Sequence, residues 1–166
     1  MPLLHPDRAA VTVGCAVLTV RDTRTFATDK SGQLLQAKLT AAPHPVLAYA
    51  LWPDEPEVVG RPVQTSVTND SMAVMVLNGG TGIAPRDTTS EVVAALLSKT
   101  LPGFGEIFRQ LSYAEIGSRA MASRAISGVC ESTLIFSLPG SSKAVALAMD
   151  KLILPELVHL TTQLRG

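Results

Sequence analysis

The sequence predicts a three-layer α/β/α domain, in which helices cover both faces of a mostly parallel central sheet. Two observations predict it: nearly unbroken aliphatic runs, which suit strands buried on both faces, and segments of helical spacing between those runs. Buried strands that alternate with helices form right-handed β-α-β units. At 166 residues the chain has the length of one domain. We therefore expect a single domain over residues 11–166, after an N-terminal extension over residues 1–10.

The elements are expected in the following order. Aliphatic runs predict strands over residues 11–20, 46–52, 72–77 and 132–138. Helices are predicted after a cap at Ser31 and over residues 90–99, 106–113 and 142–152, with Pro155 breaking or kinking the last one. Gly60 and Pro62 make the segment after the second strand a poor helix.

Composition narrows the class of partner. Fourteen basic residues balance fourteen acidic ones and are scattered along the chain, which argues against a nucleic-acid interface. The two cysteines do not suggest a disulfide framework, and no stretch has the length and character of a signal peptide or a membrane span. We expect a cytoplasmic protein that binds neither nucleic acid nor membrane, and any anion site must be local.

The loop after the third predicted strand has the composition of an anion-binding turn. Three glycines within residues 79–82 allow a tight turn that brings backbone N–H groups close to an anion. Thr88 and Glu91 fit a capping box, so the next helix would point its positive N-terminus at the same place. A sharp turn that merely needs glycine is the structural alternative. Arg86 and Asp87 in the same loop favour a binding function.

Two carboxylates follow consecutive strands. Asp54 comes after the second strand and Asp87 after the third, so parallel strands would bring both to one edge of the sheet, where such sheets bind ligands. Each has a structural alternative. Asp54 could be a helix N-cap, and Asp87 could pair with Arg86 or accept hydrogen bonds within its loop.

Two further segments are weaker candidates. Pro139, Gly140, Ser141 and Ser142 form a turn that leads into a helix, and its N–H groups and hydroxyls could bind a phosphate or a ring edge. A turn with an ordinary serine cap explains this segment equally well. The pair at residues 123–124 could bring a guanidinium group to an anion, or simply form a surface ion pair.

Six short motifs occur in an order and spacing typical of one family. They are Thr23-Arg24 with Asp29-Lys30-Ser31-Gly32, Pro53-Asp54-Glu55, Gly79-Gly80-Thr81-Gly82 with Arg86-Asp87, Pro102-Gly103-Phe104-Gly105-Glu106, Ser123-Arg124-Ala125, and Leu138-Pro139-Gly140-Ser141. With these motifs, which extend from about residue 11 to residue 159, the sequence resembles the MoaB/MogA family of molybdenum cofactor biosynthesis proteins.

The resemblance implies the adenylylation of molybdopterin by ATP with Mg²⁺, in a three-layer domain assembled as a homotrimer or hexamer, with other enzymes of the pathway as further partners. The family's two functional aspartates match Asp54 and Asp87, to which we assign catalysis and Mg²⁺ binding. The expected substrate contacts are Asn78, Gly79, Gly80, Thr81, Gly82, Arg86, Ser123, Arg124, Pro139, Gly140, Ser141 and Ser142, with Lys143 a weaker candidate. A pterin-binding or carrier homologue without activity is the alternative.

Two positions depart from the family pattern. Asn78 stands where family members usually have Ser or Thr, and Arg21 stands where Ser commonly precedes Asp. Asn78 keeps both a donor and an acceptor.

Overall fold

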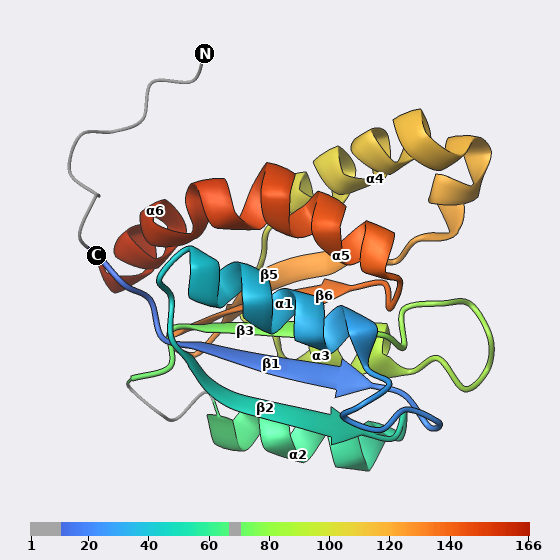
Figure 1. Cartoon of the computed structure of the whole chain (residues 1–166), viewed down its shortest axis with the longest axis horizontal. Coiled ribbons are helices and arrows are strands. Elements are labelled where there is room, and N and C mark those ends of the chain that lie inside the picture. The colour runs from blue at the N-terminus through green and yellow to red at the C-terminus, as the bar shows by residue number, and fades with distance from the viewer. Residues whose placement is uncertain (1–10, 67–70) are drawn as a thin grey trace.

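Six strands form one sheet, and helices lie on both of its faces (Figure 1). The computed structural model of the protein describes residues 11–66 and 71–166, so the extension expected at residues 1–10 lies outside the described residues. The strands are β1 (Cys15–Val20), β2 (Val46–Trp52), β3 (Val74–Asn78), β4 (Lys99–Thr100), β5 (Ile126–Cys130) and β6 (Thr133–Leu138). The helices are α1 (Lys30–Ala41), α2 (Pro56–Ser66), α3 (Thr89–Leu96), α4 (Pro102–Ile116), the 3₁₀ helix η1 (Gly117–Ala122), α5 (Ser142–Ala148), the π-helix η2 (Met149–Ile153) and α6 (Leu154–Arg165).

The strand order is β2-β1-β3-β6-β5-β4. The first four strands in this order are parallel, whereas β5 pairs antiparallel with β6 and the edge strand β4 pairs antiparallel with β5. The predicted three-layer α/β/α class with a mostly parallel sheet is therefore confirmed. Strands β4 and β5 were not predicted.

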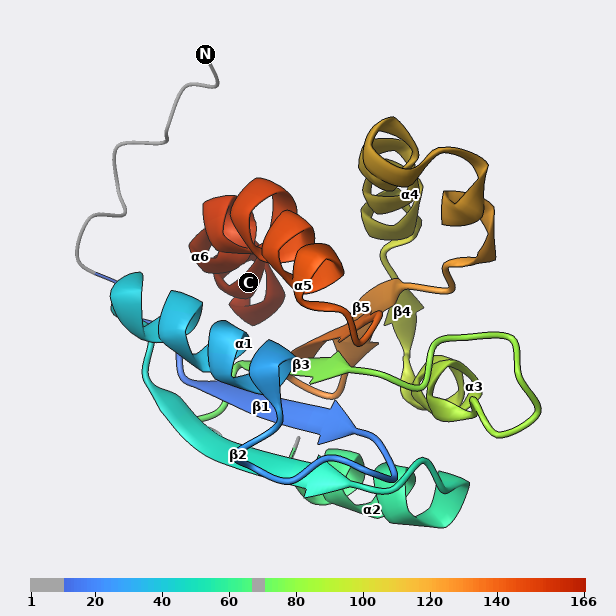
Figure 2. The same ribbon diagram turned by 45° about the vertical axis from the view of Figure 1, so that its right-hand side comes forward.

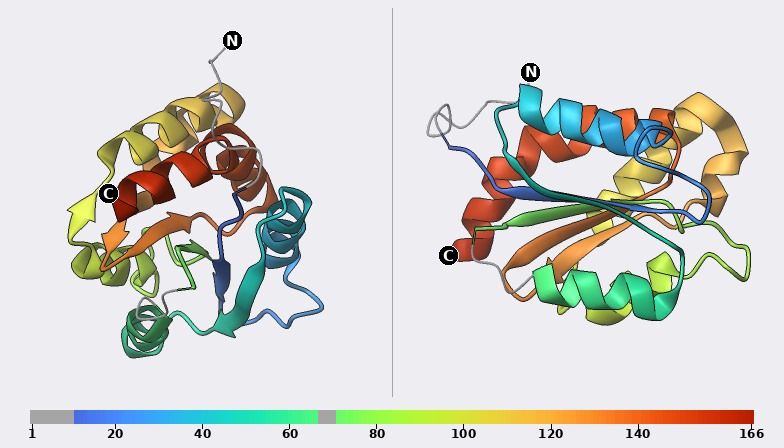
Figure 3. Two further views of the ribbon diagram at one scale, coloured as in Figure 1. Left: turned by 90° about the vertical axis from the view of Figure 1, so that its left-hand side faces the viewer. Right: turned by 60° about the horizontal axis from the view of Figure 1, so that its bottom comes forward.

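Two hydrophobic clusters fill the spaces on either side of the sheet. On one side α1, α4, α5 and α6 contribute fully buried residues such as Leu35, Phe108 and Leu157. On the other side α2 and α3 contribute Val59, Val63 and Val93, with no exposed surface. The two helical layers are visible above and below the strands in Figure 3. No helix in the described part of the chain has the length and apolar character needed to cross a membrane.

Strand β1 lies between β2 on one side and β3 on the other. The right-handed crossovers β1-α1-β2 and β2-α2-β3 run in opposite directions across the sheet, which places α1 and α2 on opposite faces (Figure 2). The loops after β1 and β3 therefore diverge, and a crevice is left between them at the carboxyl ends of the strands.

Three local expectations were wrong. First, α2 forms although it contains Gly60 and Pro62, because Val59 and Val63 pack fully against the sheet and this tertiary burial outweighs a weak intrinsic preference. Second, Asp29 rather than Ser31 caps α1, its carboxylate accepting from the Gly32 N–H at 3.1 Å.

Third, of the two alternatives for Pro155, a break or a kink, the break is wrong, since α5, η2 and α6 follow one another without interruption. Proline lacks an N–H group, and its ring collides with the carbonyl four residues earlier in a regular α-helix. The wider turn of the π-helix directly before α6 relieves this conflict.

Candidate functional site

A cavity of about 630 Å³ opens beyond the carboxyl ends of the parallel strands. Loops after β1, β2, β3 and β6 supply most of its wall, and α4, η1 and α5 close the far side. The sequence-predicted residues that line it are Asp54, Gly79, Gly80, Thr81, Gly82, Arg86, Asp87, Ser123, Pro139, Gly140 and Ser141.

The turn at the end of β3 requires glycine at two positions. Gly79 and Gly80 have φ of 98° and 68°, a region that other residues rarely adopt. A Cβ on Gly79 would lie 2.2 Å from the carbonyl oxygen of Val20, and one on Gly80 would lie 2.1 Å from Oγ1 of Thr89. The absence of side chains lets this turn lie directly against β1 and α3.

Asp54 contacts the N-terminus of α3 and not that of its own following helix. Its Oδ1 accepts hydrogen bonds from the Thr88 N–H at 3.3 Å, the Thr88 hydroxyl at 3.0 Å and the Thr89 hydroxyl at 3.1 Å. The capping box predicted from Thr88 and Glu91 does not form, because the Thr88 hydroxyl is used in this way. Oδ2 of Asp54 lies towards Gly80, 2.7 Å from where a Cβ would be.

Asp87 folds back on its own loop. Its Oδ2 accepts from the Ala84 N–H at 3.0 Å and lies 2.6 Å from where a Cβ on Gly82 would be. Asp87 forms no ion pair with Arg86 in the described part of the chain. The two aspartates thus lie beside different glycines of the turn, Asp54 beside Gly80 and Asp87 beside Gly82, in the wall of the same cavity.

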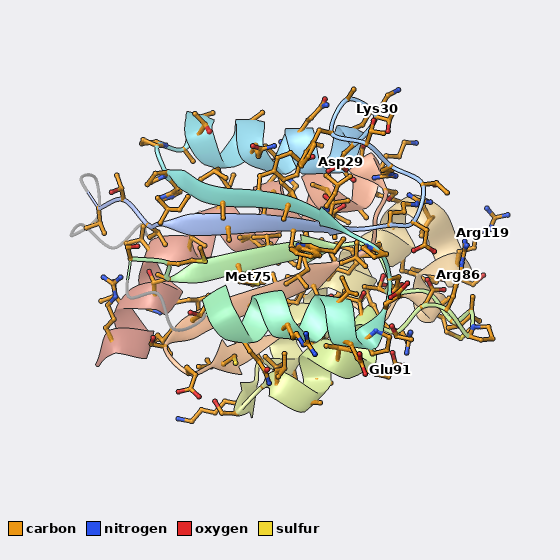
Figure 4. The ribbon with its side chains drawn as sticks, turned by 90° about the horizontal axis from the view of Figure 1, so that it is seen from below. Asp29, Lys30, Met75, Arg86, Glu91 and Arg119 are labelled. Atoms are coloured by element: carbon orange, nitrogen blue, oxygen red, sulfur yellow. The ribbon has the colours of Figure 1, made fainter. Side chains whose placement is uncertain are left out.

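Four arginines line the cavity, and they differ in how their guanidinium groups are held. Arg24 is tied down, donating to Ser31 at 2.5 Å and to the Gly140 carbonyl at 3.3 Å. The other three make no ion pair or side-chain hydrogen bond with described residues; they are Arg21, Arg86 and Arg119. Figure 4 shows Arg86 and Arg119 at the same end of the molecule, beyond the strand ends. Unpaired positive charge in a concave wall attracts anions.

A buried polar network supports the cavity from beneath. The Tyr49 hydroxyl on β2 donates to Oδ2 of Asp29, which has no exposed surface. Burial would raise the pKa of Asp29, but hydrogen bonds from Thr19, Tyr49 and Gly32 and the charge of Arg24 together hold it below its usual value. The same burial and the bond to Asp29 raise the pKa of Tyr49. Asp29 is therefore a charged anchor for the loop that carries Arg24.

Asn78 belongs to this network, which corrects the expectation that its side chain contacts substrate. Its amide nitrogen donates to Thr19 at 2.8 Å, and its oxygen accepts from Ser31 at 2.8 Å. The side chain is fully buried and does not line the cavity. Asn78 thus fixes the start of α1 to the end of β3.

Three other predicted contacts also lie outside the wall. Ser142 is exposed at the start of α5, behind Ser141, whose side chain caps that helix through the Ala144 N–H at 3.1 Å. Lys143 lines a separate surface groove between α4 and α5. Arg124 directs its guanidinium at backbone carbonyls of the β3-α3 loop.

Several wall residues were not among the predicted substrate contacts. Those after β1 are Arg21, Asp22, Thr23 and Arg24, and those on α4, η1 and α5 are Phe108, Ser112, Ile116, Arg119, Ala122 and Ala144. The first group follows the first predicted strand, where such a sheet binds ligands, and Thr23-Arg24 belongs to one of the six motifs, but no substrate contact was assigned to it. The second group carries no local signal, because only the packing of α4 against the sheet brings it to the cavity.

A comparison with known protein families identifies the family of this chain. A model of the probable molybdopterin binding domain matches residues 9–159. The chain belongs to this family. Among curated proteins of this MoaB/MogA group, molybdenum cofactor biosynthesis protein B of Bacillus subtilis (strain 168) is 51% identical over 162 residues, which are 97% of this chain and 95% of that protein.

Solved structures of family members share the fold described above. A crystal structure of molybdenum cofactor biosynthesis protein B has 50% identity and a TM-score of 0.92, over 95% of this chain and 99% of that one. The tungsten cofactor synthesizing protein MoaB from Pyrococcus furiosus has 32% identity and a TM-score of 0.84, over 93% and 98%. The MoaB/MogA membership expected from the six motifs is therefore confirmed, and the protein takes part in molybdenum cofactor biosynthesis.

Proposed function

We propose that this MoaB/MogA protein transfers the adenylyl group of ATP to the terminal phosphate of molybdopterin, in the cytoplasm, and releases pyrophosphate. One observation carries the proposal: Asp54 and Asp87 lie beside a glycine turn in a cavity that arginine side chains also line. Family membership supports molybdopterin as the ligand.

The reaction needs positioning and charge compensation more than proton transfer. A phosphate oxygen of the pterin, anionic near neutral pH, attacks the α-phosphorus of ATP. The bond from that phosphorus to the bridging oxygen breaks, and pyrophosphate leaves with the electron pair. Arg21, Arg86 and Arg119 would offset the repulsion between two polyanions, and the walls of the cavity would hold them in line.

The glycine turn is suited to phosphate oxygens. Gly79 and Gly80 present backbone without side chains to the cavity, so a phosphate could approach the N–H groups of the turn closely. The N-terminus of α3 begins beside it and adds a favourable dipole.

The two aspartates fit a Mg²⁺ ion that arrives with the nucleotide. Mg²⁺ is usually held by one or two carboxylates together with phosphate oxygens and waters. Oδ2 of Asp54 and the carboxylate of Asp87 both border space that a Cβ would fill. No group of three His, Cys, Asp or Glu residues that could hold a metal by itself occurs among the described residues. When bound, the metal would neutralise charge on the triphosphate.

One observation favours a second function, that of a pterin-binding or carrier protein without activity. Oδ1 of Asp54 is already occupied by three donors, so this residue has a complete structural role without any metal. Such a protein would hold the pterin and protect it without consuming ATP.

We further propose that the protein acts as a homotrimer or hexamer. Large apolar side chains are exposed on α4 and η1, including Tyr113 (64%), Ile116 (52%) and Met121 (84%), and such a surface suits self-association. Light scattering coupled to gel filtration measures the assembly; a monomer would contradict this part of the proposal.

The experiment that separates the two functions measures pyrophosphate release from ATP with molybdopterin and Mg²⁺. The enzyme should release one pyrophosphate for each adenylylated pterin, and release should stop when molybdopterin or Mg²⁺ is omitted. Pterin binding, measured in parallel by equilibrium dialysis, should persist without ATP. Binding without any pyrophosphate release would establish the carrier function instead.

A further inference from the structure

Arg124, in the segment between η1 and β5, contacts the β3-α3 loop from outside the cavity. Its Nε donates to the Thr81 carbonyl at 3.3 Å, and its Nη2 donates to the carbonyls of Asp87 at 3.0 Å and of Gly82. Its Nη1 donates to the carboxylate of Glu91 on α3. One side chain thus joins both ends of the loop that carries the glycine turn and the catalytic candidate Asp87.

Arg124 is itself held in place by two helices. Arg109 on α4 donates from Nη1 to the carbonyl oxygens of Ser123 at 3.3 Å and Ala125 at 3.1 Å, the neighbours of Arg124 on either side. The Ser90 hydroxyl on α3 donates to the carbonyl of Arg124 at 3.4 Å. The backbone around Arg124 is therefore hydrogen-bonded to both α4 and α3.

The other hydrogen bonds that hold this loop lie within it, between Ala84 and Asp87, or at its end, where Asp54 accepts from Thr88 and Thr89. Residues 82–86 are exposed, and the side chain of Ile83 has 78% of its surface accessible, so no buried apolar side chain fixes this stretch. Backbone carbonyls held by a guanidinium group form charge-assisted hydrogen bonds, which are stronger than neutral ones. Arg124 therefore adds three charge-assisted hydrogen bonds to the backbone of a stretch that burial does not fix.

Arg124 also has little capacity left for a ligand. A guanidinium group has five N–H donors, and four hydrogen bonds already run to this loop and to Glu91. The hydrogen bond and charge of Arg124 lower the pKa of Glu91 below its usual value. Because most of its donors are used in this way, we do not expect Arg124 to bind a phosphate directly.

We propose that Arg124 is a positioning residue, which holds the loop of residues 81–87 so that Asp87 and the glycine turn face the cavity. Its effect on turnover rests on the proposed function, but its effect on the loop does not. The predicted effect on turnover can therefore fail while the predicted effect on the loop holds.

The structural part is tested by amide hydrogen exchange over residues 81–91 in the full-length protein. In Arg124→Gln, exchange in this segment should be roughly tenfold faster or more, as expected for the loss of hydrogen bonds from a charged donor. The matched control is Arg165→Gln, which removes an exposed arginine at the end of α6 that does not line the cavity; it should exchange as the wild type does. Unchanged exchange in Arg124→Gln would overturn the proposal, whether or not the protein turns over.

The kinetic part separates positioning from phosphate binding. If Arg124 positions the loop, Arg124→Gln should lower kcat for pyrophosphate release roughly 100-fold with a much smaller change in KM for ATP. Arg124→Lys should be almost as impaired, because lysine keeps the charge but loses the planar fork. A lysine variant with wild-type kcat, or a defect confined to KM, would instead indicate a direct phosphate contact and overturn the proposal.

A milder variant keeps the test valid if Arg124→Gln does not fold. Arg124→Lys keeps the positive charge but loses the planar fork that bonds the loop carbonyls, so the fold should survive. Faster exchange over residues 81–91 in this variant supports the proposal, and exchange equal to the wild type contradicts it. If wild-type protein releases no pyrophosphate, the proposed function fails while hydrogen exchange still decides the role of Arg124.

Discussion

Asp54 and Thr88 are 34 residues apart in the sequence and are joined by two hydrogen bonds, from the N–H and the hydroxyl of Thr88 to Oδ1 of Asp54. The carboxylate thereby caps α3 from a different loop, and it adds negative charge at the positive end of that helix. The loops after β2 and β3 are fastened together by this contact. It also places one oxygen of Asp54 in a structural role and leaves the other facing the glycine turn.

Substitution of Asp54 should separate these two roles. Asp54→Ala removes the cap and should lower the free energy of unfolding by about 1–2 kcal/mol, as measured by urea denaturation. Asp54→Asn keeps an acceptor oxygen and should be nearly as stable as the wild type, yet release pyrophosphate much more slowly. Thr88→Val removes one donor to the cap without touching charge, and serves as the control. Normal turnover in Asp54→Asn would restrict this residue to its structural role.

Asp87→Asn should impair turnover while pterin binding is retained. Asparagine can still accept the hydrogen bond from the Ala84 N–H, so the loop should keep its shape while the negative charge is lost. We expect kcat for pyrophosphate release to fall by on the order of 100-fold, as when one preorganised charge-stabilising group is removed. Steady-state kinetics at saturating Mg²⁺, with equilibrium dialysis of the pterin, measure both quantities. Turnover at the wild-type rate would exclude a metal role for Asp87.

Tyr49→Phe should destabilise the protein through Asp29. The substitution keeps the ring, which packs edge-on against Phe26 with centroids 5.1 Å apart, and removes only the hydroxyl that donates to the buried carboxylate. A lost hydrogen bond to a charged group costs about 1.5–3 kcal/mol. Chemical denaturation at pH 7 measures the loss; Phe26→Leu is the control for the ring contact alone.

Tyr49→Phe should also change how the free energy of unfolding depends on pH in the acid range. The pKa of Asp29 is lowered in the folded state, so its charge contributes stability above the unfolded-state value near 3.8, and this contribution is lost as the pH falls through the folded-state pKa. In Tyr49→Phe the pKa of Asp29 should rise towards the unfolded value, and the stability lost on acidification should be smaller. An identical acid profile in the two proteins would contradict this account.

His44 should make the protein less stable below about pH 6.5. Burial lowers the pKa of His44, and its Nδ1 accepts a hydrogen bond from the Val13 N–H at 3.1 Å. Because the unfolded chain binds the proton more readily, stability falls as the pH drops below the unfolded-state value of 6.5, with a slope of at most about 1.4 kcal/mol per pH unit. Unfolding free energies between pH 5 and 8 measure the slope. In His44→Asn, which cannot be protonated, this part of the slope should vanish.

The sequence predicted the parallel part of the sheet because each of those strands is an aliphatic run, as strands covered by helices on both faces require. It did not predict β5, because a glycine such as Gly128 weakens the pattern of a strand. In the structure, a Cβ at Gly128 would lie 2.3 Å from the Lys99 carbonyl oxygen on β4, so the glycine permits close pairing of these two strands. A local pattern cannot reveal a requirement set by a partner strand.

The candidate site was predictable where loops follow strands and not where side chains pair over long distances. The positions of Asp54 and Asp87 at one sheet edge follow from parallel connection alone. The hydrogen bonds of Arg124 to the β3-α3 loop could not be predicted in this way. Its acceptors there are backbone carbonyls 37 to 43 residues away, and any residue type can supply a backbone carbonyl. The burial of Asn78 was missed for the same reason, since its partners lie on β1 and α1.

The π-helical turn η2 should let the C-terminal helix tolerate the deletion of one residue. In a regular α-helix, positions four residues apart drift by about 40° around the axis, and the wider π turn reduces this drift between Met149, Ile153 and Leu157, which are all fully buried. The wide turn absorbs one residue without altering the phase of α6. Deleting a residue inside it should leave Leu157 against the sheet, but a deletion in α5 should rotate the start of the helix away from the core.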